Sequence, residues 1–551
     1  MKVLSFLHLP SFLLLLSFIV GLGGCNQKTE NHKELYDVVI YGATSAGVAA
    51  AVQVHRMGKT VVVVAQGKHI GGLTTGGLGQ TDIGNKFVIG GISKEFYARI
   101  AKKYENPEAW KWQRKEVYKS TGQRKETDES AMWTFEPKVA MEVIGDMIRE
   151  NEISVVYDER LDFSKGVQME GSEIKYIVSE TGKKYYGRVF IDATYEGDLM
   201  ALSGVSYTVG RESGSQYGED LNGVRIEQAI YHQFPDGVDP YVVAGDAASG
   251  LLPGVNPGIN PEGTGDNKVQ AYCFRMCLTN VPGNRVPFEK PEGYNEIEYE
   301  MLFRSIDAGF KKQFFIMSAM PNGKTDSNNY GPLSSDYIGR NYQYPDGDYK
   351  KRAEIIREHE IYQKGLMWTL ANHPRIPDDI RNEFSQWGLP KDEFIDNGHW
   401  TPQLYIREAR RMISNFVMTQ LHCTQDSIVT QSVGMGAYTM DSHNVQRHVN
   451  INGHLKNEGD VEVGGFGPYP ISYKAIVPKR DQCTNLLVPV CLSASHIGFG
   501  SIRMEPVFMV LGQSAATAAC MAIDENDVVQ DVDYEVLKAR LIADKQILFI
   551  E

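Results

Sequence analysis

The chain has 551 residues, enough for two or three connected domains that bury a large core. Its formal net charge is −13, and no basic stripe offsets this acidity, so nucleic acid is not expected as a partner. The hydrophobic fraction of 42% is ordinary for a globular protein, and the sequence contains no internal repeat or low-complexity tract.

The N-terminus resembles a bacterial lipoprotein signal. An apolar stretch ends in two glycines followed by Cys25, and small residues directly before a cysteine are typical of a lipobox. We therefore assign residues 1–25 to a signal, with Cys25 as the lipidated first residue of the mature protein, and residues 26–35 to a polar tether. The alternative is a transmembrane anchor, because the stretch is about long enough to span a bilayer, although Pro10 interrupts it. The prediction is an exported protein, in the periplasm or at the cell surface, held on the lipid bilayer by Cys25.

The run from Asp37 to Ala51 is an apolar strand, a turn of small residues and an Ala-rich helix. This pattern is typical of a dinucleotide site, because Gly42 permits the tight turn and Gly47 lets the helix pack closely on the sheet. The free amides at the helix start then face a pyrophosphate. Thr44 stands where the G-x-G-x-x-G pattern has its second glycine, and its hydroxyl can donate a hydrogen bond instead. The expected contacts are Gly42, Thr44, Ser45, Ala46 and Gly47, and the alternative is an ordinary βα turn.

A second apolar strand, Thr60 to Val64, follows at the spacing of a βαβ unit. It ends in Ala65 and Gln66, where a carboxylate normally binds the adenosine ribose, and this argues against a simple NAD site. The ribose must then be held by Gln66, Lys68, His69 or backbone groups.

A glycine-dense segment, Gly71 to Gly79, comes next. Such a run lets the chain lie against a flat ring system and a diphosphate, which suits a buried flavin better than a nicotinamide that must come and go. The alternative is a flexible surface loop.

Residues 129–150 have the apolar spacing of an amphipathic helix that covers the sheet. Short strands are expected at 154–157, 173–179 and 184–190. The last of these leads to Asp198, which returns the chain to the cofactor edge of a doubly wound sheet. Asp198 is expected to hold a polar end of the cofactor or to cap the helix that follows it.

The middle of the chain, roughly Val205 to Arg480, is rich in aromatic and amide residues and is the candidate substrate domain. Four aromatic residues are candidates for stacking on sugar rings, with core packing as the alternative for each: Trp387, Trp400, Tyr405 and Tyr438.

A helix is expected from Thr401 to His422. It carries Arg407, Arg410 and Arg411, which would recognise a carboxylate such as that of a uronic acid or would pair with surface carboxylates. For at least one of the three we favour pairing with surface carboxylates.

Two histidines are candidates for a general base, and Arg407 is included with them as a catalytic candidate. His443 follows a Gly-rich approach and Asp441, which is expected to orient its imidazole. His496 is the competitor, because it lies beside the presumed flavin segment. No metal-ligand spacing stands out, so no metal is expected.

A C-terminal helix is predicted around Pro506, whose position suits a first turn, and its small residues allow very close packing. Its electropositive N-terminus, aimed at the pyrimidine end of a flavin, would stabilise the negative charge that develops there on reduction. The alternative is a buried Ala-rich core helix.

Together these segments resemble a bacterial family of FAD-dependent oxidoreductases, related in fold to the glutathione reductase and fumarate reductase flavoproteins. The resemblance covers nearly the whole mature chain and rests on the motifs Val39-Ile40-Tyr41-Gly42-Ala43-Thr44-Ser45-Ala46-Gly47, His69-Ile70-Gly71-Gly72, Asp192-Ala193-Thr194-Tyr195-Glu196-Gly197-Asp198-Leu199, Arg407-Glu408-Ala409-Arg410-Arg411, Met440-Asp441-Ser442-His443-Asn444 and Arg503-Met504-Glu505-Pro506. It implies an α/β fold, in which residues 36–204 and 481–551 build a doubly wound, Rossmann-like FAD-binding domain and residues 205–480 form an inserted α+β substrate domain. It also implies FAD contacts, besides those of the first turn, from Gly71, Gly72, Thr74, Thr75, Gly76, Asp198, Arg503, Glu505, Gly512 and Gln513, while Gln66 and Lys68 remain the candidates for the ribose because Ala65 departs from the usual pattern.

The resulting hypothesis is an exported FAD-dependent oxidoreductase that oxidises a carbohydrate, or a related hydroxylated small molecule, by hydride transfer to flavin N5. Its electron acceptor is not assigned. Some relatives bear the label xanthan lyase, so a polysaccharide lyase is one alternative, and a non-catalytic ligand-binding lipoprotein is another.

Overall fold

The computed structural model describes residues 34–119, 130–311 and 313–550. The predicted signal with Cys25, and all but the last two residues of the predicted tether, lie outside the described residues. Leu35–Glu551 forms one compact unit, so the division of this unit into domains at 204/205 and 480/481 stays a prediction.

A seven-stranded sheet carries the N-terminal part of the fold. Its parallel strands follow the order β3-β2-β1-β6, the short strand β25 pairs in parallel with the end of β6, and antiparallel β5 and β4 extend the edge. The strands are β1 (Leu35–Tyr41), β2 (Val61–Val64), β3 (Ser154–Val156), β4 (Val167–Glu170), β5 (Glu173–Val178), β6 (Lys184–Asp192) and β25 (Leu486–Leu487). This arrangement, with β25 supplied from the far end of the sequence, is the doubly wound sheet that the sequence predicts.

Alternate residues of β1 enter two different cores. Val38 and Ile40 pack with the helices on one face of the sheet, whereas Val39 and Tyr41 pack with the residues on the other face. A strand buried on both faces must be apolar throughout, which explains the continuous Val/Ile run. The helices of this part of the fold, on both faces of the sheet, are α1 (Ser45–Arg56), α2 (Gly72–Thr75), α3 (Gly91–Lys103), α4 (Pro137–Glu150), α5 (Asp198–Leu202), α11 (His496–Ile502), α12 (Glu505–Glu525) and α13 (Tyr534–Ala543).

Helices α1 and α12 cross at very close range. A Cβ atom on Gly512 would lie 2.3 Å from the carbonyl oxygen of Ala46, so only glycine allows this approach. By length and composition α12 could cross a membrane, but 94% of its apolar window is buried inside the protein. It is therefore a core helix, as its small residues predict.

The middle of the chain forms a second core around a five-stranded antiparallel sheet of order β13-β16-β12-β15-β14. These strands are β12 (Met276–Thr279), β13 (Arg285–Pro287), β14 (Phe315–Met320), β15 (Lys324–Asn329) and β16 (Gly388–Pro390). The helices of the middle segment are α6 (Gly214–Tyr217), α7 (Glu300–Asp307), α8 (Tyr349–Asn372), α9 (Asp378–Phe384) and α10 (Gln420–Cys423).

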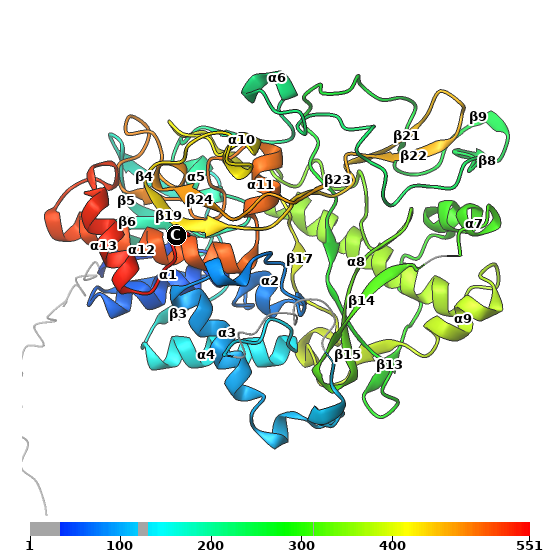
Figure 1. Cartoon of the computed structure of the whole chain (residues 1–551), viewed down its shortest axis with the longest axis horizontal. Helices are drawn as coiled ribbons and strands as arrows, with labels where there is room; N and C mark the ends of the chain where they lie inside the picture. Colours follow the sequence, from blue (N-terminus) through cyan, green and yellow to red (C-terminus); the bar gives the residue numbers. More distant parts are fainter. Residues whose placement is uncertain (1–33, 120–129, 312, 551) are drawn as a thin grey trace, which may run out of the picture. The chain divides into compact units, whose positions relative to one another are not determined.

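Small sheets complete the middle and connect it to the first core. They are β10 (Val255–Asn256), β21 (Gln446–Val449) and β22 (Leu455–Glu458) in one sheet, and the pairs β7 (Tyr207–Thr208) with β18 (Arg411–Met412), β8 (Tyr241–Val243) with β9 (Asp246–Leu251), β11 (Cys273–Phe274) with β17 (Leu404–Tyr405), β19 (Ser432–Gly436) with β24 (Tyr469–Ser472), and β20 (Met440–Ser442) with β23 (Val461–Val463). Figure 1 shows α1, α3 and α4 beside α12 and α13, while the green middle segment with α7, α8 and α9 lies on the other side.

Val433 and Ile471, from inside the predicted substrate domain, belong to the first core, so the apolar packing does not change at residue 480.

Most predicted elements are confirmed with small shifts at their ends. These are the strands at 60–64, 154–157, 173–179 and 184–190, the helix within 129–150, which begins at Pro137, and the C-terminal helix with Pro506 in its first turn. Residue 129 itself lies outside the described residues.

The helix predicted from Thr401 to His422 is wrong. The segment forms the short strands β17 and β18, and only Gln420–Cys423 is helical. Tertiary pairing overrides the local pattern here, because Leu404 and Tyr405 pair with β11 while Arg411 and Met412 pair with β7.

Candidate active site

The two glycine-rich turns meet in space, and we call residues 42–47 and 71–79 the glycine cradle. Gly42 has a φ of +106°, and a Cβ atom there would lie 2.8 Å from the backbone of Ala193. A Cβ atom on Gly47 would lie 2.0 Å from the carbonyl oxygen of Gly42. Gly71 donates its amide to the carbonyl of Ala43 at 2.7 Å, which holds the second turn against the first. The helix α1 leaves its first amides without intrahelical acceptors beside these turns.

Glu505 ties the cradle to α12. Its buried carboxylate accepts hydrogen bonds from Ser45 Oγ at 2.5 Å, Thr74 Oγ1 at 2.7 Å and Tyr195 OH at 2.7 Å. Burial raises the pKa of Glu505, and the hydroxyl groups of Ser45, Thr74 and Tyr195 partly oppose that rise. The starts of α1, α2 and α12 are thereby fixed relative to one another.

Hydroxyls of the cradle bond to other groups of the protein. Thr44 caps α1, and its Oγ1 donates to the carbonyl of Ala193 at 2.6 Å, not to a group outside the chain. Thr75 Oγ1 donates to the carbonyl of Ile70, and a Cβ atom on Gly72 would lie 2.2 Å from Tyr195 OH.

The end of β2 carries no carboxylate. Ala65 is buried, Gln66 is half-buried and Lys68 is exposed. Gly76, at the far side of the cradle, packs so closely on Gln403 that a Cβ atom would lie 2.4 Å from the Gln403 side chain.

Three expected cofactor residues have protein partners elsewhere. Asp198 accepts from Arg352 at 2.6 and 2.8 Å and from Arg410 at 2.7 Å, and Gly512 packs on α1. Gln513 Oε1 accepts the amide of Ile92 at the start of α3, beside a pocket of about 690 Å³. The helix-cap alternative for Asp198 is wrong, because α5 has Gly197 as its cap and no side-chain cap.

A second group of polar side chains surrounds His443, and we call Asp336, Arg407, Asp441, His443 and Arg503 the histidine cluster. His443 Nδ1 lies 2.7 Å from Asp336 Oδ2, and Asp336 Oδ1 lies 2.9 Å from Arg407 Nη2. The second ring nitrogen, Nε2, has no hydrogen bond among the described residues and lies 3.8 Å from Asp441 Oδ1. The prediction that Asp441 orients the imidazole is therefore wrong, because Asp336 holds that place.

Charges within this cluster set its protonation states. Burial and the Arg407 cation lower the pKa of His443, while Asp336 and Asp441 oppose this change. Burial raises the pKa of Asp336, but Arg407 and His443 lower it by a larger amount. The pKa of Asp336 therefore lies well below its usual range. At neutral pH the cluster therefore holds a neutral His443 against an ionised Asp336.

Arg503 links the cluster to α12. Its Nη1 donates to Tyr405 OH at 2.7 Å, and its Nη2 lies 3.2 Å from Asp441 Oδ2. Its Nε is buried and has no partner among the described residues.

His496, the competing base, uses both ring nitrogens. Nδ1 lies 2.7 Å from Glu408 Oε2 and Nε2 lies 3.1 Å from Ser442 Oγ. Burial, with Arg411 and Arg211, lowers the pKa of His496 to about 3. This histidine is held as a neutral structural group.

All three arginines are buried, and one of them, Arg410, pairs with the exposed carboxylate of Asp346 at 2.9 Å, as the surface-carboxylate alternative predicts for at least one. Arg407 pairs with Asp336, Arg410 also with Asp198, and Arg411 with Glu212 and Glu408. A buried guanidinium needs such partners, which explains why the segment is held extended between elements.

A family model for FAD dependent oxidoreductases matches residues 37–541. The chain belongs to the FAD dependent oxidoreductase family. It is therefore a flavoenzyme with FAD as its cofactor, in agreement with the sequence-based expectation.

Curated proteins give no match. OxyS anhydrotetracycline hydroxylase from Streptomyces rimosus is a similar solved structure, with 11% identity over 36% of this chain and 41% of that chain and a TM-score of 0.23. L-amino acid deaminase from Proteus vulgaris has 15% identity over 32% of this chain and 53% of that chain, with a TM-score of 0.23. For 3-ketosteroid-delta4-(5alpha)-dehydrogenase from Rhodococcus jostii RHA1 the identity is 16% over 31% of this chain and 48% of that chain, with a TM-score of 0.19. The oxidoreductase thus spans between 41% and 53% of the length of these chains, and scores this low carry no conclusion about activity.

The glycine cradle of the oxidoreductase fits FAD. Side chains at Gly42 and Gly47 would collide with backbone, the start of α1 is electropositive, and the buried Arg503 Nε is an unused donor. The absence of a carboxylate after β2 leaves the ribose to Gln66, Lys68 or backbone groups. These contacts remain predictions.

The sequence reasoning missed Asp336 and assigned no role to Tyr195. Tyr195 stands in the motif before Gly197 and Asp198, so the motif itself marked it. Asp336 lies in a loop with no local signal, and only the fold brings it to His443.

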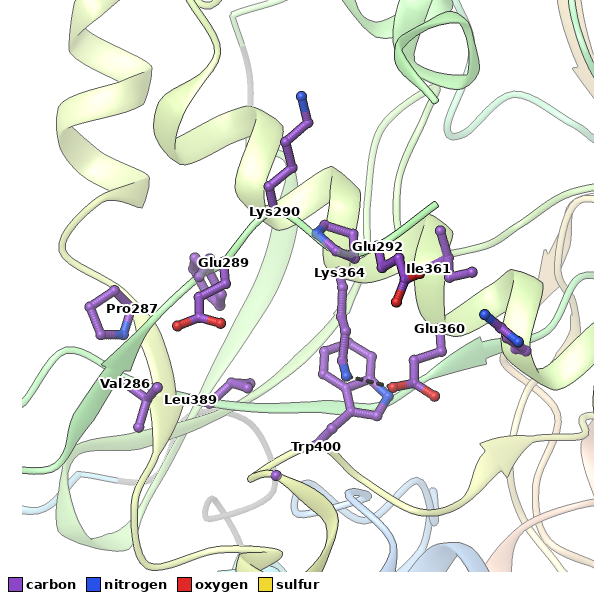
Figure 2. Close-up of a pocket in the computed structure, with 14 residues that line it drawn as sticks. Val286, Pro287, Glu289, Lys290, Glu292, Glu360, Ile361, Lys364, Leu389 and Trp400 are labelled. Atoms are coloured by element: carbon purple, nitrogen blue, oxygen red, sulfur yellow. Dashed lines mark hydrogen bonds and ion pairs between the residues drawn. The ribbon is translucent and has the colours of Figure 1, made fainter. Parts of the chain in front are cut away.

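Figure 2 shows a surface pocket of about 560 Å³ beside β13 and α8. Trp400, one of the four aromatic candidates, lines it with only 2% of its surface exposed, and none of the predicted catalytic or cofactor residues is among its lining residues. Tyr405 is also buried, so core packing describes both better than sugar stacking. Trp387 and Tyr438 are half-buried.

Proposed function

We propose that this oxidoreductase oxidises a hydroxylated substrate, with a carbohydrate as the leading candidate, and that His443 is the general base. The observation that carries the proposal is the geometry of the imidazole. Asp336 holds Nδ1 at 2.7 Å, which leaves Nε2 without a hydrogen bond to receive a proton.

The reaction converts a secondary alcohol to a ketone, or a hemiacetal to a lactone. FAD, when bound, supplies the two-electron acceptor for the hydride of the substrate C–H bond. His443 Nε2 takes the hydroxyl proton, and the ionised Asp336 stabilises the imidazolium that forms. Arg407 holds Asp336 in its charged form, so that Asp336 accepts the hydrogen bond of the Nδ1 proton of His443 and does not itself take up a proton.

Partly exposed carboxylates around Tyr405 support a substrate with many hydroxyls. The carboxylates of Asp441 and Asp82, both within electrostatic range of Tyr438, are 18% and 23% exposed, so both remain available to accept hydrogen bonds from hydroxyl groups. Asp82 lies 3.3 Å from Arg275, and Asp441 lies 3.2 Å from Arg503, so each carboxylate is oriented by a cation. Alternating acceptors and donors of this kind suit a sugar better than an apolar substrate.

Export and lipid anchoring complete the proposal and rest on the sequence alone. Cys25→Ser is expected to abolish lipid labelling of the expressed protein, because the thiol is the acceptor of the lipid. Intact residues 1–24 on the mature wild-type protein would favour a transmembrane anchor instead.

The reaction class is tested by mixing FAD-loaded enzyme anaerobically with glucose, galactose, mannose, glucuronate and polymeric xanthan. Bleaching of the flavin band by one of these sugars supports oxidation. An unsaturated uronate product with an unchanged flavin spectrum would support a lyase, and saturable binding without either change would support a binding protein.

A further inference from the structure

Arg447 is a buried cation that has no hydrogen-bond or ion-pair partner in the part of the chain that the structure describes. It lies in β21, the central strand of the sheet β10-β21-β22, and only 2% of its surface is exposed. No guanidinium nitrogen of Arg447 has an acceptor among the described residues, and its Nε and Nη2 atoms are fully enclosed.

The other deeply buried arginines differ from it. Arg211 pairs with Asp266 and Glu458, Arg275 pairs with Asp326, and Arg407 pairs with Asp336. Burial lowers the pKa of Arg447, yet a guanidinium stays charged in proteins. An unpaired buried charge is strongly destabilising. Arg447 therefore needs a counter-charge, and the described residues do not supply one.

A second arginine faces the same place. Arg340 has a buried Nε without a partner, while its Nη2 donates to Glu298 at 2.8 Å and to Tyr337 OH at 3.0 Å. A Cβ atom built on Gly254 would lie 3.9 Å from Arg447 Nη1 and 4.0 Å from Arg340 Cδ. The two arginine side chains therefore flank one point beside Gly254, where no side chain stands.

The local charge favours an anion. Glu298 forms an ion pair with Arg340 and Glu358 lies within electrostatic range of Arg340, but neither carboxylate forms an ion pair with Arg447 among the described residues. The point is reachable from solvent, because Gly254 is half-buried and the Arg340 side chain is 32% exposed.

We propose that Arg447 and Arg340 form a binding site for an oxyanion, either the carboxylate of an acidic sugar or a tetrahedral oxyanion such as sulfate or phosphate. Arg447 Nη1, the guanidinium nitrogen that faces this point, would donate to such a group, and the charge of the Arg340 guanidinium would add to the attraction. The site uses no residue of the histidine cluster, whose two arginines, Arg407 and Arg503, already pair with Asp336 and Asp441.

The test measures thermal unfolding and isothermal titration of the FAD-loaded full chain with sodium sulfate, sodium acetate and sodium glucuronate, each against sodium chloride at equal ionic strength. We expect a saturable rise in Tm for the wild type that is lost in Arg447→Met. Sulfate also stabilises proteins by exclusion from their surface, so only the difference between wild type and variant counts.

Arg340→Met provides a second variant at a partly exposed position, and its oxyanion affinity is expected to fall by about tenfold or more, because one charged donor is lost. Arg149→Met, which removes an arginine that is 72% exposed, is the matched control and keeps the wild-type response. A response to sulfate alone identifies a tetrahedral ligand, and a response to acetate and glucuronate identifies a carboxylate.

Two results would contradict the proposal of an oxyanion site. One is a wild-type protein with no saturable response to any of the three oxyanions. The other is an equal response in Arg447→Met or, if that variant does not fold, an unchanged affinity in Arg340→Met.

Discussion

The glycine cradle and the histidine cluster are built from different parts of the chain. The cradle consists of backbone, and its shape follows from two short segments in which a side chain would collide with a neighbouring carbonyl. The histidine cluster consists of five side chains from four separated parts of the chain, held by ion pairs such as Asp336 with Arg407. A backbone site therefore tolerates no added atoms, whereas a side-chain site should lose its function stepwise as its charges are removed.

The largest expected effect is in the cradle. Gly47→Val places side-chain atoms where even a Cβ would lie 2.0 Å from the Gly42 carbonyl, so α1 must move off the sheet. We expect colourless protein without FAD, measured as the ratio of absorbance at about 450 nm, a general flavin band, to protein absorbance. Gly145→Ala is the control, since a Cβ atom there meets nothing within 4 Å. Full flavin occupancy in Gly47→Val would contradict this placement of the cofactor.

The histidine cluster should respond in graded steps. Asp336→Asn removes the charge that supports His443, and a hydrogen bond to a charged group contributes about 1.5–3 kcal/mol, or roughly ten- to a hundredfold in rate. Asp336 raises the pKa of His443 and Arg407 lowers it. The acid limb of the rate of flavin reduction should therefore shift to lower pH in Asp336→Asn and to higher pH in Arg407→Met.

Stopped-flow measurement of flavin reduction between pH 5 and 9 checks these shifts. A role in folding alone would lower stability in both variants without moving the acid limb in opposite directions. Shifts in the same direction would remove the assigned roles of Asp336 and Arg407.

The smallest effect concerns a buried carboxylate near the cluster. Burial raises the pKa of Asp460 to about 8, Glu462 adds to the rise, and His232 opposes it. Between the ordinary carboxyl pKa and pH 8 the folded protein holds a proton that the unfolded chain has lost, so this group's contribution to stability falls as the pH rises through that window. Asp460→Asn keeps the neutral form and should raise Tm above pH 8 by roughly 1–4 °C, measured by calorimetry.

The exposed Asp481→Asn is the control for this measurement and should leave the pH dependence of Tm unchanged. A Tm of Asp460→Asn below that of the wild type at pH 9 would mean that the ionised carboxylate has a stabilising partner.

The contrast between a backbone site and a side-chain site also determines which features could be predicted from the sequence. The strand, turn and helix from Asp37 to Ala51 are encoded locally, so the Rossmann-type fold and FAD could be predicted from them. The predicted helix from Thr401 to His422 failed because its arginines find carboxylates on distant elements, which local spacing does not encode. Asp336 was missed for the same reason, whereas His443 was found because it stands in a motif.

The most direct test of the account compares two histidines by anaerobic stopped-flow reduction of the flavin with a sugar that bleaches it. His443→Gln should bind FAD and keep its yellow colour, yet reduce about 10²–10⁴ times more slowly than the wild type, because a positioned base is lost. His496→Gln should reduce within about tenfold of the wild-type rate but unfold at a lower temperature, because it breaks the buried bond to Glu408. Wild-type reduction by His443→Gln, together with a collapse of the rate in His496→Gln, would contradict the account and make His496 the base.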